Sequence, residues 1–494
     1  MIFTFLKAVS NFINEWTPLA LLMCYICTSF FFYLVIPDNL HTGLWYAFIC
    51  LQTFVTFAVL AEAVSSVRPN VVARRVMRKA EKEGFPDLPE EKCPRIDVVF
   101  VAYLPNEKDI ILRQIRYAIR QQNYPSSKLH FYVIYNTPVD IPPVEKELRK
   151  IERQCKNLTV YRVPNSTSKA ENLNFLLQQK TRGDITTILD TDHFLEKNAL
   201  YYVARRFNSG DVDVIQGRCC IYNHDESWVT KMVAAEVDVI YGAMHPGRAE
   251  LQGYGLFGGS NGHWNTSLLR TLQLNPKMLT DDIDVALRAI TSGARVAYDL
   301  KVISYETAPA TVMALFKQRS RWAQGWTQVF QKHTLPALKR GAYGSTYRSR
   351  FGLFFLLAFR EFYFYGVSQF SMLLMASLLT NPPKSWEALY STFIGFSLSI
   401  WILVLNLSCL AAIAFVTLRN TSTFVRPNSV ITFMAMSPGY FTIVSLVAIL
   451  CHFRQLVGFK RWNPTVRTAA VTQGPRSTLA HNDGYDTPVT AVEA

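Results

Sequence analysis

The sequence predicts a soluble α/β domain inserted between two blocks of membrane-spanning helices. Half of the 494 residues are apolar and only 18% are charged, below the roughly 25% of an average soluble domain. The long apolar runs fall before residue 68 and after residue 350. Between them, short apolar runs alternate with amphipathic helical patterns, which is typical of a mainly parallel sheet covered by helices on both faces.

The N-terminal block, residues 1–67, predicts two membrane crossings. Thr17–Ile36 contains no charged residue and is long enough to cross a bilayer. No small-residue cleavage site follows it, so we expect a retained span rather than a signal peptide. The second run, residues 43–67, is interrupted only by Glu62.

A basic linker, residues 68–94, follows the second run. It carries arginines and lysines up to Lys82, whereas residues 37–42, between the two runs, carry none. The positive-inside rule therefore places the following domain in the cytosol. The linker is compatible with a helix up to Gly84, and we expect this helix to lie on anionic headgroups.

The C-terminal block, residues 351–453, contains three long apolar stretches, at 351–379, 389–418 and 429–453. Arg360 and Glu361 would be costly at the bilayer centre, so we expect the first crossing to begin near Phe362.

The tail, residues 454–494, is basic and then polar. Three crossings in the preceding block would place it outside, yet its basic residues favour the inside. A break at Met436-Ser-Pro-Gly439, giving an interfacial and a re-entrant piece, is one solution, and the sequence leaves this question open.

Charge and cysteine content narrow the range of partners. The net charge of +14 favours phosphorylated substrates and anionic lipid. The sequence has no zinc-finger, P-loop or helix–turn–helix pattern, so we expect no nucleic-acid partner. The nine cysteines form no disulfide framework, and Cys24-x-x-Cys27 lies in an apolar run without a second ligand pair. Nothing in the sequence indicates an oligomeric state.

Residues 95–310 predict the α/β domain, and residues 311–350 predict interfacial helices. Strands are expected at 96–102, 129–135, 158–163 and 185–189, with helices at 108–121 and 168–179. The strand that ends at Leu189 is followed by Asp190-Thr-Asp192-His193. Ligands bind α/β sheets at the carboxyl ends of strands, and two carboxylates there can hold a divalent cation and a diphosphate. Alone, the pattern also fits a solvated turn.

Two further patterns follow along the chain. Thr280-Asp281-Asp282 precedes a helical pattern, where the threonine can cap the helix and an acid can serve as a general base. Gln318-x-x-Arg321-Trp322 offers a guanidinium for an anion and an aromatic face for a sugar ring. Such residues are also common in interfacial helices.

In this order, and between membrane blocks, the three patterns resemble the processive family-2 glycosyltransferases, such as cellulose, hyaluronan and chitin synthases. The resemblance covers residues 95–330 and the flanking membrane layout. It implies a cytosolic GT-A domain, a Rossmann-like fold that binds nucleotide sugars, between N- and C-terminal transmembrane helices. The implied activity is inverting transfer from a UDP-sugar to a β-linked polysaccharide that crosses the plasma membrane. A non-processive, ceramide-type lipid glycosyltransferase is the alternative.

The resemblance also implies roles for single residues. Asp282 would be the catalytic base, and Asp281 stands where the family usually has glutamate. Mg²⁺ or Mn²⁺ would be held by Asp190, Asp192 and His193. The nucleotide sugar would contact Tyr103, Asn106, Glu107, Asn136, Lys169, Asp190 and Arg321. The growing glycan would contact Gly259, Ser260, Asn261, Trp264, Gln318 and Trp322.

One position departs from the family pattern. The second strand is followed by Asn136, where family members usually carry an aspartate that reads uracil. An amide donates and accepts hydrogen bonds but carries no charge. Asp140, further along the same loop, is the substitute that the sequence offers.

Overall fold

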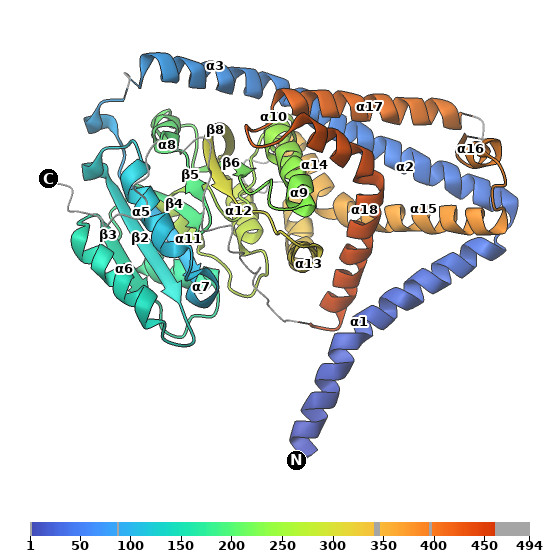
Figure 1. The fold of residues 1–494 in the computed structure, drawn as a ribbon, viewed down its shortest axis with the longest axis horizontal. Helices are drawn as coiled ribbons and strands as arrows, with labels where there is room; N and C mark the ends of the chain where they lie inside the picture. The colour runs from blue at the N-terminus through green and yellow to red at the C-terminus, as the bar shows by residue number, and fades with distance from the viewer. Residues whose placement is uncertain (1, 86–87, 340–345, 395–397, 460–494) are drawn as a thin grey trace.

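The computed structural model describes residues 2–85, 88–339, 346–394 and 398–459. An α/β domain lies beside a set of long helices, which extend away from it on one side (Figure 1). The domain corresponds to the region of short alternating apolar runs, and the helices correspond to the long apolar runs. The predicted insertion of an α/β domain between apolar blocks is therefore confirmed.

Eight strands form one mixed sheet in the order β3-β2-β1-β4-β7-β6-β8-β5. Their bounds are β1 (Ile96–Tyr103), β2 (Leu129–Asn136), β3 (Leu158–Arg162), β4 (Ile185–Asp190), β5 (Phe194–Leu195), β6 (Val214–Ile221), β7 (Gly262–Asn265) and β8 (Val296–Glu306). Strands β1 to β4 are parallel, as predicted, and β6 and β8 are also parallel. The unpredicted β7 is antiparallel to both β4 and β6, and it joins the two halves.

Alternate residues of the central strand enter two separate cores. In β1, Val98 and Phe100 belong to the core under α5 (Ile111–Gln121), α6 (Pro142–Gln154) and α8 (Ala199–Asn208). Val99 and Val101 belong to the opposite core, under α7 (Lys169–Gln178), α11 (Thr266–Leu272) and α12 (Asp281–Thr291). Side chains of a strand alternate between faces, so a continuous apolar run is what a strand covered on both faces requires.

Within the described ranges, five helical segments are long and apolar enough to cross a membrane. They involve α1 (Ile2–Val35), α2 (Asp38–Ser65), α14 (Tyr347–Phe354) with α15 (Arg360–Thr380), α17 (Ser399–Arg419) and α18 (Pro427–Leu456). The predicted stretch 389–418 is divided between α16 (Trp386–Ile394) and α17. The predicted break at Met436–Gly439 is wrong, because α18 is one helix that contains Pro438.

The basic linker forms α3 (Val67–Glu83), so the predicted helix up to Gly84 is confirmed, and its position on anionic headgroups stays a prediction. The helix continues α2 past the edge of the bundle and lies along the α/β domain (Figure 1). Its apolar face, with Val76, Met77 and Ala80, packs against the core under α8. Part of the amphipathic pattern therefore serves a protein contact, while Val67, Val71 and Val72 of the same helix stay exposed.

The Arg360–Glu361 pair lies inside a helix that is continuous from Tyr347 to Thr380. Glu361 is buried and accepts one hydrogen bond from Arg360 at 2.6 Å, while its other oxygen lies 2.6 Å from Nε2 of His452 on α18. Pairing offsets part of the cost of burying the charges, so these residues do not interrupt the helix.

Candidate active site

A pocket of about 160 Å³ opens at the carboxyl ends of β1, β2 and β4. It is lined by Val101, Ala102, Tyr103, Asn106, Glu107, Asn136, Thr167, Ser168, Lys169, Asn172, Asp190, Asp281 and Arg321. All seven residues predicted to contact a nucleotide sugar are among them. The sequence interpretation missed Thr167, Ser168 and Asn172, although the serine at a helix start was a signal for the first two.

Lys169 stands in the middle of this site. Ser168 caps α7 by accepting a hydrogen bond from the backbone of Glu171, which fixes the start of the helix. The Lys169 ammonium donates to Asp190 Oδ1 and to the Gly259 carbonyl, each at 2.5 Å. Burial alone would lower the pKa of Lys169, but the carboxylates of Asp190 and Asp281 outweigh it and raise the pKa. The ammonium therefore stays charged.

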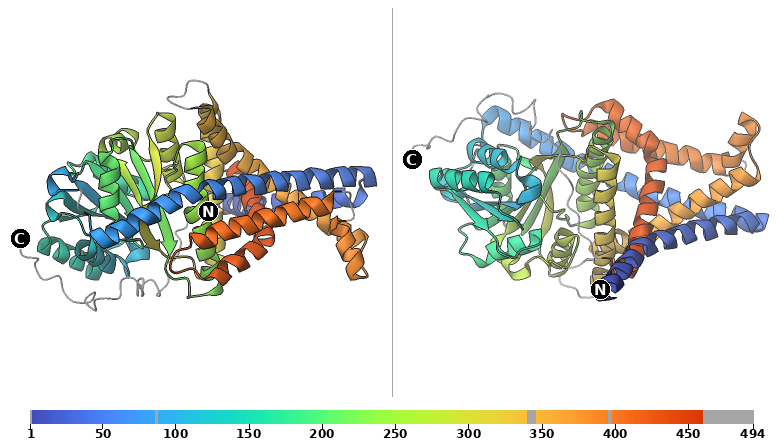
Figure 2. Two further views of the ribbon diagram at one scale, coloured as in Figure 1. Left: turned by 90° about the horizontal axis from the view of Figure 1, so that it is seen from above. Right: turned by 60° about the horizontal axis from the view of Figure 1, so that its bottom comes forward.

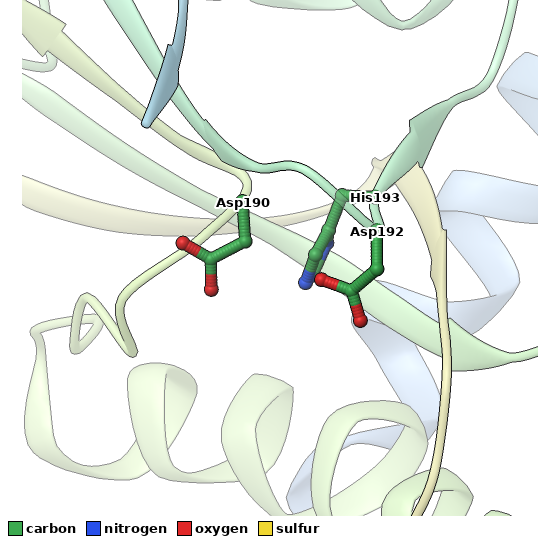
Figure 3. A group of neighbouring side chains, drawn as sticks. All are labelled: Asp190, Asp192 and His193. Atoms are coloured by element: carbon green, nitrogen blue, oxygen red, sulfur yellow. The ribbon is translucent and has the colours of Figure 1, made fainter. Parts of the chain in front are cut away.

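Asp190, Asp192 and His193 place one ligand atom each within 4.8 Å of one another (Figure 3). Carboxylate oxygens suit Mg²⁺ or Mn²⁺, so the two aspartates fit a metal. Asp192 is oriented by Thr307, whose hydroxyl donates to Oδ2 at 2.9 Å.

His193 is less available for metal coordination than the two aspartates. Its Nδ1 lies 3.1 Å from the Ser304 hydroxyl, and its Nε2 lies 3.1 Å from Glu306. Burial alone would lower the pKa of His193, but the Glu306 carboxylate outweighs it and raises the pKa. A coordinating histidine needs an unprotonated nitrogen, so His193 would have to give up a protein partner first.

Asp281 and Asp282 begin α12 directly beside the pocket. Thr280 occupies the N-cap position without a side-chain capping bond. It packs instead on α13 (Val312–Leu338), where a Cβ on Gly325 would lie 2.4 Å from its methyl group. The contact brings the start of α12 against the helix that carries Arg321.

The two acids share a buried environment. Burial raises the pKa of Asp281 to about 7, and the neighbouring Asp282 adds to the increase. Burial also raises the pKa of Asp282, although Lys169 opposes this. Raised carboxyl pKa values in a pocket are typical of proton-transfer groups.

The loop that precedes β7 meets these acids at one glycine. Gly259 has a φ of +99°, and a Cβ there would lie 2.6 Å from Asp282 Oδ2. A side chain is excluded both by the backbone conformation and by the carboxylate, so Gly259 is the loop residue that approaches Asp282.

The other residues of this loop region that were predicted to contact the glycan instead hold the loop in place. Ser260 accepts a hydrogen bond from the Asp190 backbone at 3.0 Å. Asn261 is fully buried and donates to two backbone carbonyls at 3.1 Å. Trp264 is fully buried and packs against Phe257. Asn261 and Trp264 offer no surface to a glycan, and we correct the expectation for both.

Helix α13 carries the remaining predicted residues. Gln318 and Trp322 lie on it one turn apart, and Trp322 is 38% exposed. The Arg319 guanidinium lies 4.5 Å from the centre of the Trp322 ring and is itself paired with Glu236 at 2.5 Å. The indole is thus held in place while part of its surface stays open.

The amide that replaces the usual aspartate is already bonded within the protein. Asn136 donates to the Ser166 carbonyl at 3.0 Å and accepts from Asn172 at 2.8 Å. Asp140 does not line the pocket and pairs with Arg162 at 2.8 Å. Asp140 is therefore not the substitute that the sequence suggested.

Asp284 connects α12 to α13 from inside the protein. Its carboxylate is fully buried and lies within 2.9 Å of Arg288, Lys332 and His333. Burial alone would raise the pKa of Asp284, but the hydrogen bonds from His333 and Lys332 outweigh it and lower the pKa. This anchor fixes α12, which begins with Asp281 and Asp282, against the helix that carries Arg321.

Replacing Asp284 by asparagine should destabilise the protein by about 3 kcal/mol, at the low end for a broken buried ion pair, because Lys332 keeps some exposure. A carboxyl group whose pKa is lower in the folded than in the unfolded protein stabilises the folded state fully at pH values above its unfolded pKa of about 4. The loss should therefore be full at pH 7 and shrink as the pH falls below about 4. Thermal unfolding in detergent, followed by tryptophan fluorescence, measures it. Asp211→Asn, at a half-exposed pair with Arg206, is the control with little effect.

Comparison with known families identifies the class of protein to which this fold belongs, a transferase. Residues 94–325, just under half of the chain, match the family model described as "Glycosyltransferase like family 2". The chain therefore carries a family-2 glycosyltransferase domain, with the α/β sheet of the GT-A fold and long apolar helices on both sides of it.

Similar proteins are named for different products. The probable glycosyltransferase YdaM of Bacillus subtilis is 22% identical over 75% of this chain and 84% of its own. The beta-monoglucosyldiacylglycerol synthase of Synechocystis is 26% identical over 58% of this chain and 60% of its own. Glucomannan 4-beta-mannosyltransferase 1 of rice is 23% identical over 55% of this chain and 54% of its own. The match thus spans less than two thirds of the latter two proteins.

Among solved structures, the mannosyltransferase PcManGT of Pyrobaculum calidifontis, in complex with GDP-Man and Mn²⁺, matches 74% of this chain and 100% of its own. The identity is 19% and the TM-score is 0.48.

Proposed function

We propose that the protein is a metal-dependent, inverting glycosyltransferase that uses a cytosolic UDP-sugar to extend a β-linked glycan and passes it across the plasma membrane. The observation that carries the proposal is the convergence of Lys169, Asp190 and Arg321 on one pocket, beside the Asp281–Asp282 pair. Cationic side chains suit a diphosphate, and buried acids suit proton transfer.

In this proposal the donor diphosphate lies between Lys169 and Arg321, whose charges stabilise it as it leaves. A divalent cation held by Asp190 and Asp192 would supply further positive charge to the diphosphate when bound. Asp282 accepts the proton of the acceptor hydroxyl. That oxygen attacks the anomeric carbon from the face opposite the diphosphate, so an α-linked donor gives a β-linked product.

The structure gives less evidence on the acceptor than on the donor. The rice relative is named for transfer to a glucomannan, and the Synechocystis relative for synthesis of a glucolipid. We favour a glycan, because Trp322 on α13 offers an oriented aromatic surface of the kind on which sugars stack. A lipid acceptor is the second candidate, supported by the glucolipid synthase and by the apolar helices beside the domain.

Product analysis distinguishes the two candidates. The full-length protein in lipid nanodiscs is supplied with radiolabelled UDP-sugars and GDP-mannose, and the product is sized and digested with linkage-specific glycosidases. We expect one nucleotide sugar to give long β-linked chains. If the product is only mono- or diglycosylated lipid, the lipid glycosyltransferase replaces the polymer synthase.

Trp322→Ala should shorten the product, because the terminal sugar loses its stacking partner, while nucleotide-sugar affinity changes little. Arg321→Ala should instead weaken donor use, since Arg321 lines the donor pocket and Trp322 does not. Product length on a gel and nucleoside-diphosphate release are measured on the same samples. Trp228→Ala, another exposed tryptophan away from the pocket lining, is the matched control. Equal shortening in the control would contradict a specific role of Trp322.

A further inference from the structure

Helix α18 contacts the catalytic domain at its beginning. Val430 and Phe433, in its first two turns, belong to one buried cluster with Ile221 at the end of β6 and Val229 on α9 (Trp228–Val239). Further along α18, the Tyr440 hydroxyl donates to Glu236 of α9 at 3.0 Å. The first half of the helix therefore lies on the domain.

The last turns of α18 contact α13, the helix that follows the α/β domain and packs on α12. The Cys451 thiol donates to the Ser320 carbonyl at 3.2 Å. Beyond the end of the helix, the Phe459 carbonyl accepts a hydrogen bond from the Gln324 side chain at 2.6 Å. A helix of 30 residues is about 45 Å long, and along this length α18 contacts first the α/β domain and then α13.

The other long helices are arranged differently. α2 pairs with the domain near its end, where Glu62 binds Arg248 at 2.9 Å. Near its beginning it contacts α15 instead, through His41 and Ser377. α17 likewise ends at the domain, where the Asn420 carbonyl accepts a hydrogen bond from Arg218 at 2.7 Å. These helices have one end at the domain and the other end away from it, as crossing helices must.

The direction of α18 agrees with these contacts. It runs crosswise to α15 and α17 and lies beside α13, between the α/β domain and the long helices (Figures 1 and 2). On its far side, Thr442 and His452 contact α15, and Ile449 and Leu450 pack with Leu22 of α1. In its most apolar window 44% of residues are buried within the protein, against 11–28% in the other four segments.

We infer that α18 does not cross the bilayer but lies parallel to it, in the leaflet next to the catalytic domain. Its partner there is the boundary between acyl chains and headgroups, which receives its exposed side chains Ile431, Met436, Phe441 and Ile443. The described part of the chain then crosses four times, through α1, α2, α15 and α17. Residue 459 lies on the same side as the active site.

This topology resolves the disagreement between the number of crossings predicted for the C-terminal block and the basic residues of the tail. The residues that follow position 459 include Lys460, Arg461, Arg467 and Arg476, and the positive-inside rule favours the same side for them as for the basic linker 68–94. The inference concerns topology only, so it does not depend on which sugar or acceptor the enzyme uses.

The first test is protease protection of the full-length protein in sealed vesicles whose outer face exposes the catalytic domain. One epitope tag follows Ala494. A second tag is inserted, without deleting any residue, within residues 382–384 between α15 and α16. We expect protease to remove the C-terminal tag together with the domain, and the 382–384 tag to survive until detergent is added. Protection of the C-terminal tag, or loss of the inserted tag in sealed vesicles, overturns the inference.

The second test compares lysine substitutions at two exposed apolar positions in the middle of their helices, Ile443 on α18 and Leu407 on α17. A lysine near the headgroups extends its ammonium to water, whereas one at the bilayer centre is costly. Ile443→Lys should leave the folded yield in detergent-solubilised membranes near the wild-type level, and Leu407→Lys should lower it severalfold. Equal losses would mean that α18 also crosses.

Discussion

Asp282→Asn is expected to lower the transfer rate by roughly 10²-fold or more, the usual contribution of a general base, while donor binding survives. Asparagine keeps the shape that fits against Gly259 but cannot accept the proton. Because burial raises the pKa of Asp282, the wild-type rate should fall as the pH drops through a value above the ordinary pKa of about 4. Single-turnover transfer and equilibrium donor binding, measured across pH, separate the two effects.

Asp281→Asn is the matched control for this experiment. Asp281 has the same chemistry and a similarly buried place, but it lines the donor pocket. Its loss should change donor affinity more than the rate of the chemical step. An active Asp282→Asn with an inactive Asp281→Asn would exchange the two roles.

The lining of the pocket was predictable because it depends on local signals. The residues that line the pocket follow β1, β2 and β4, whose apolar runs are visible in the sequence, or begin α7 behind the capping residue Ser168. The ends of neighbouring parallel strands meet at one edge of a sheet. Polar residues that follow such strands therefore converge without further information.

Features that depend on distant contacts were not predictable. Trp264 beside a glycine-rich loop suggested a sugar platform, but its packing on Phe257 buries it. The strand that contains Trp264 has only four residues, too few to show an alternating pattern. The amphipathic pattern of α3 did not show that Val76, Met77 and Ala80 pack on the core of the α/β domain, and the apolarity of α18 carried no information on its direction.

Asp192→Ala is expected to abolish measurable transfer. The metal role proposed for this carboxylate is worth several kcal/mol, and each 1.4 kcal/mol or so is a tenfold change in rate. Excess Mn²⁺ should not restore the rate, because the variant has lost one of the carboxylates that would position the metal ion. Chelation of the wild type should have the same effect and be reversed by adding Mg²⁺ or Mn²⁺. Calorimetric titration with donor, in the presence and absence of Mn²⁺, gives a readout that is independent of turnover.

Two companion variants determine whether charge or position explains the loss. Asp192→Asn keeps the size of the side chain and an oxygen for the Thr307 hydroxyl but removes the charge, so it should behave like Asp192→Ala. Thr307→Val removes the hydrogen bond of 2.9 Å and keeps the charge, so it should retain metal-dependent donor binding and most of the activity. If Thr307→Val is as inactive as Asp192→Ala, Asp192 acts by holding the loop in place. Full wild-type turnover in excess chelator would exclude the metal role altogether.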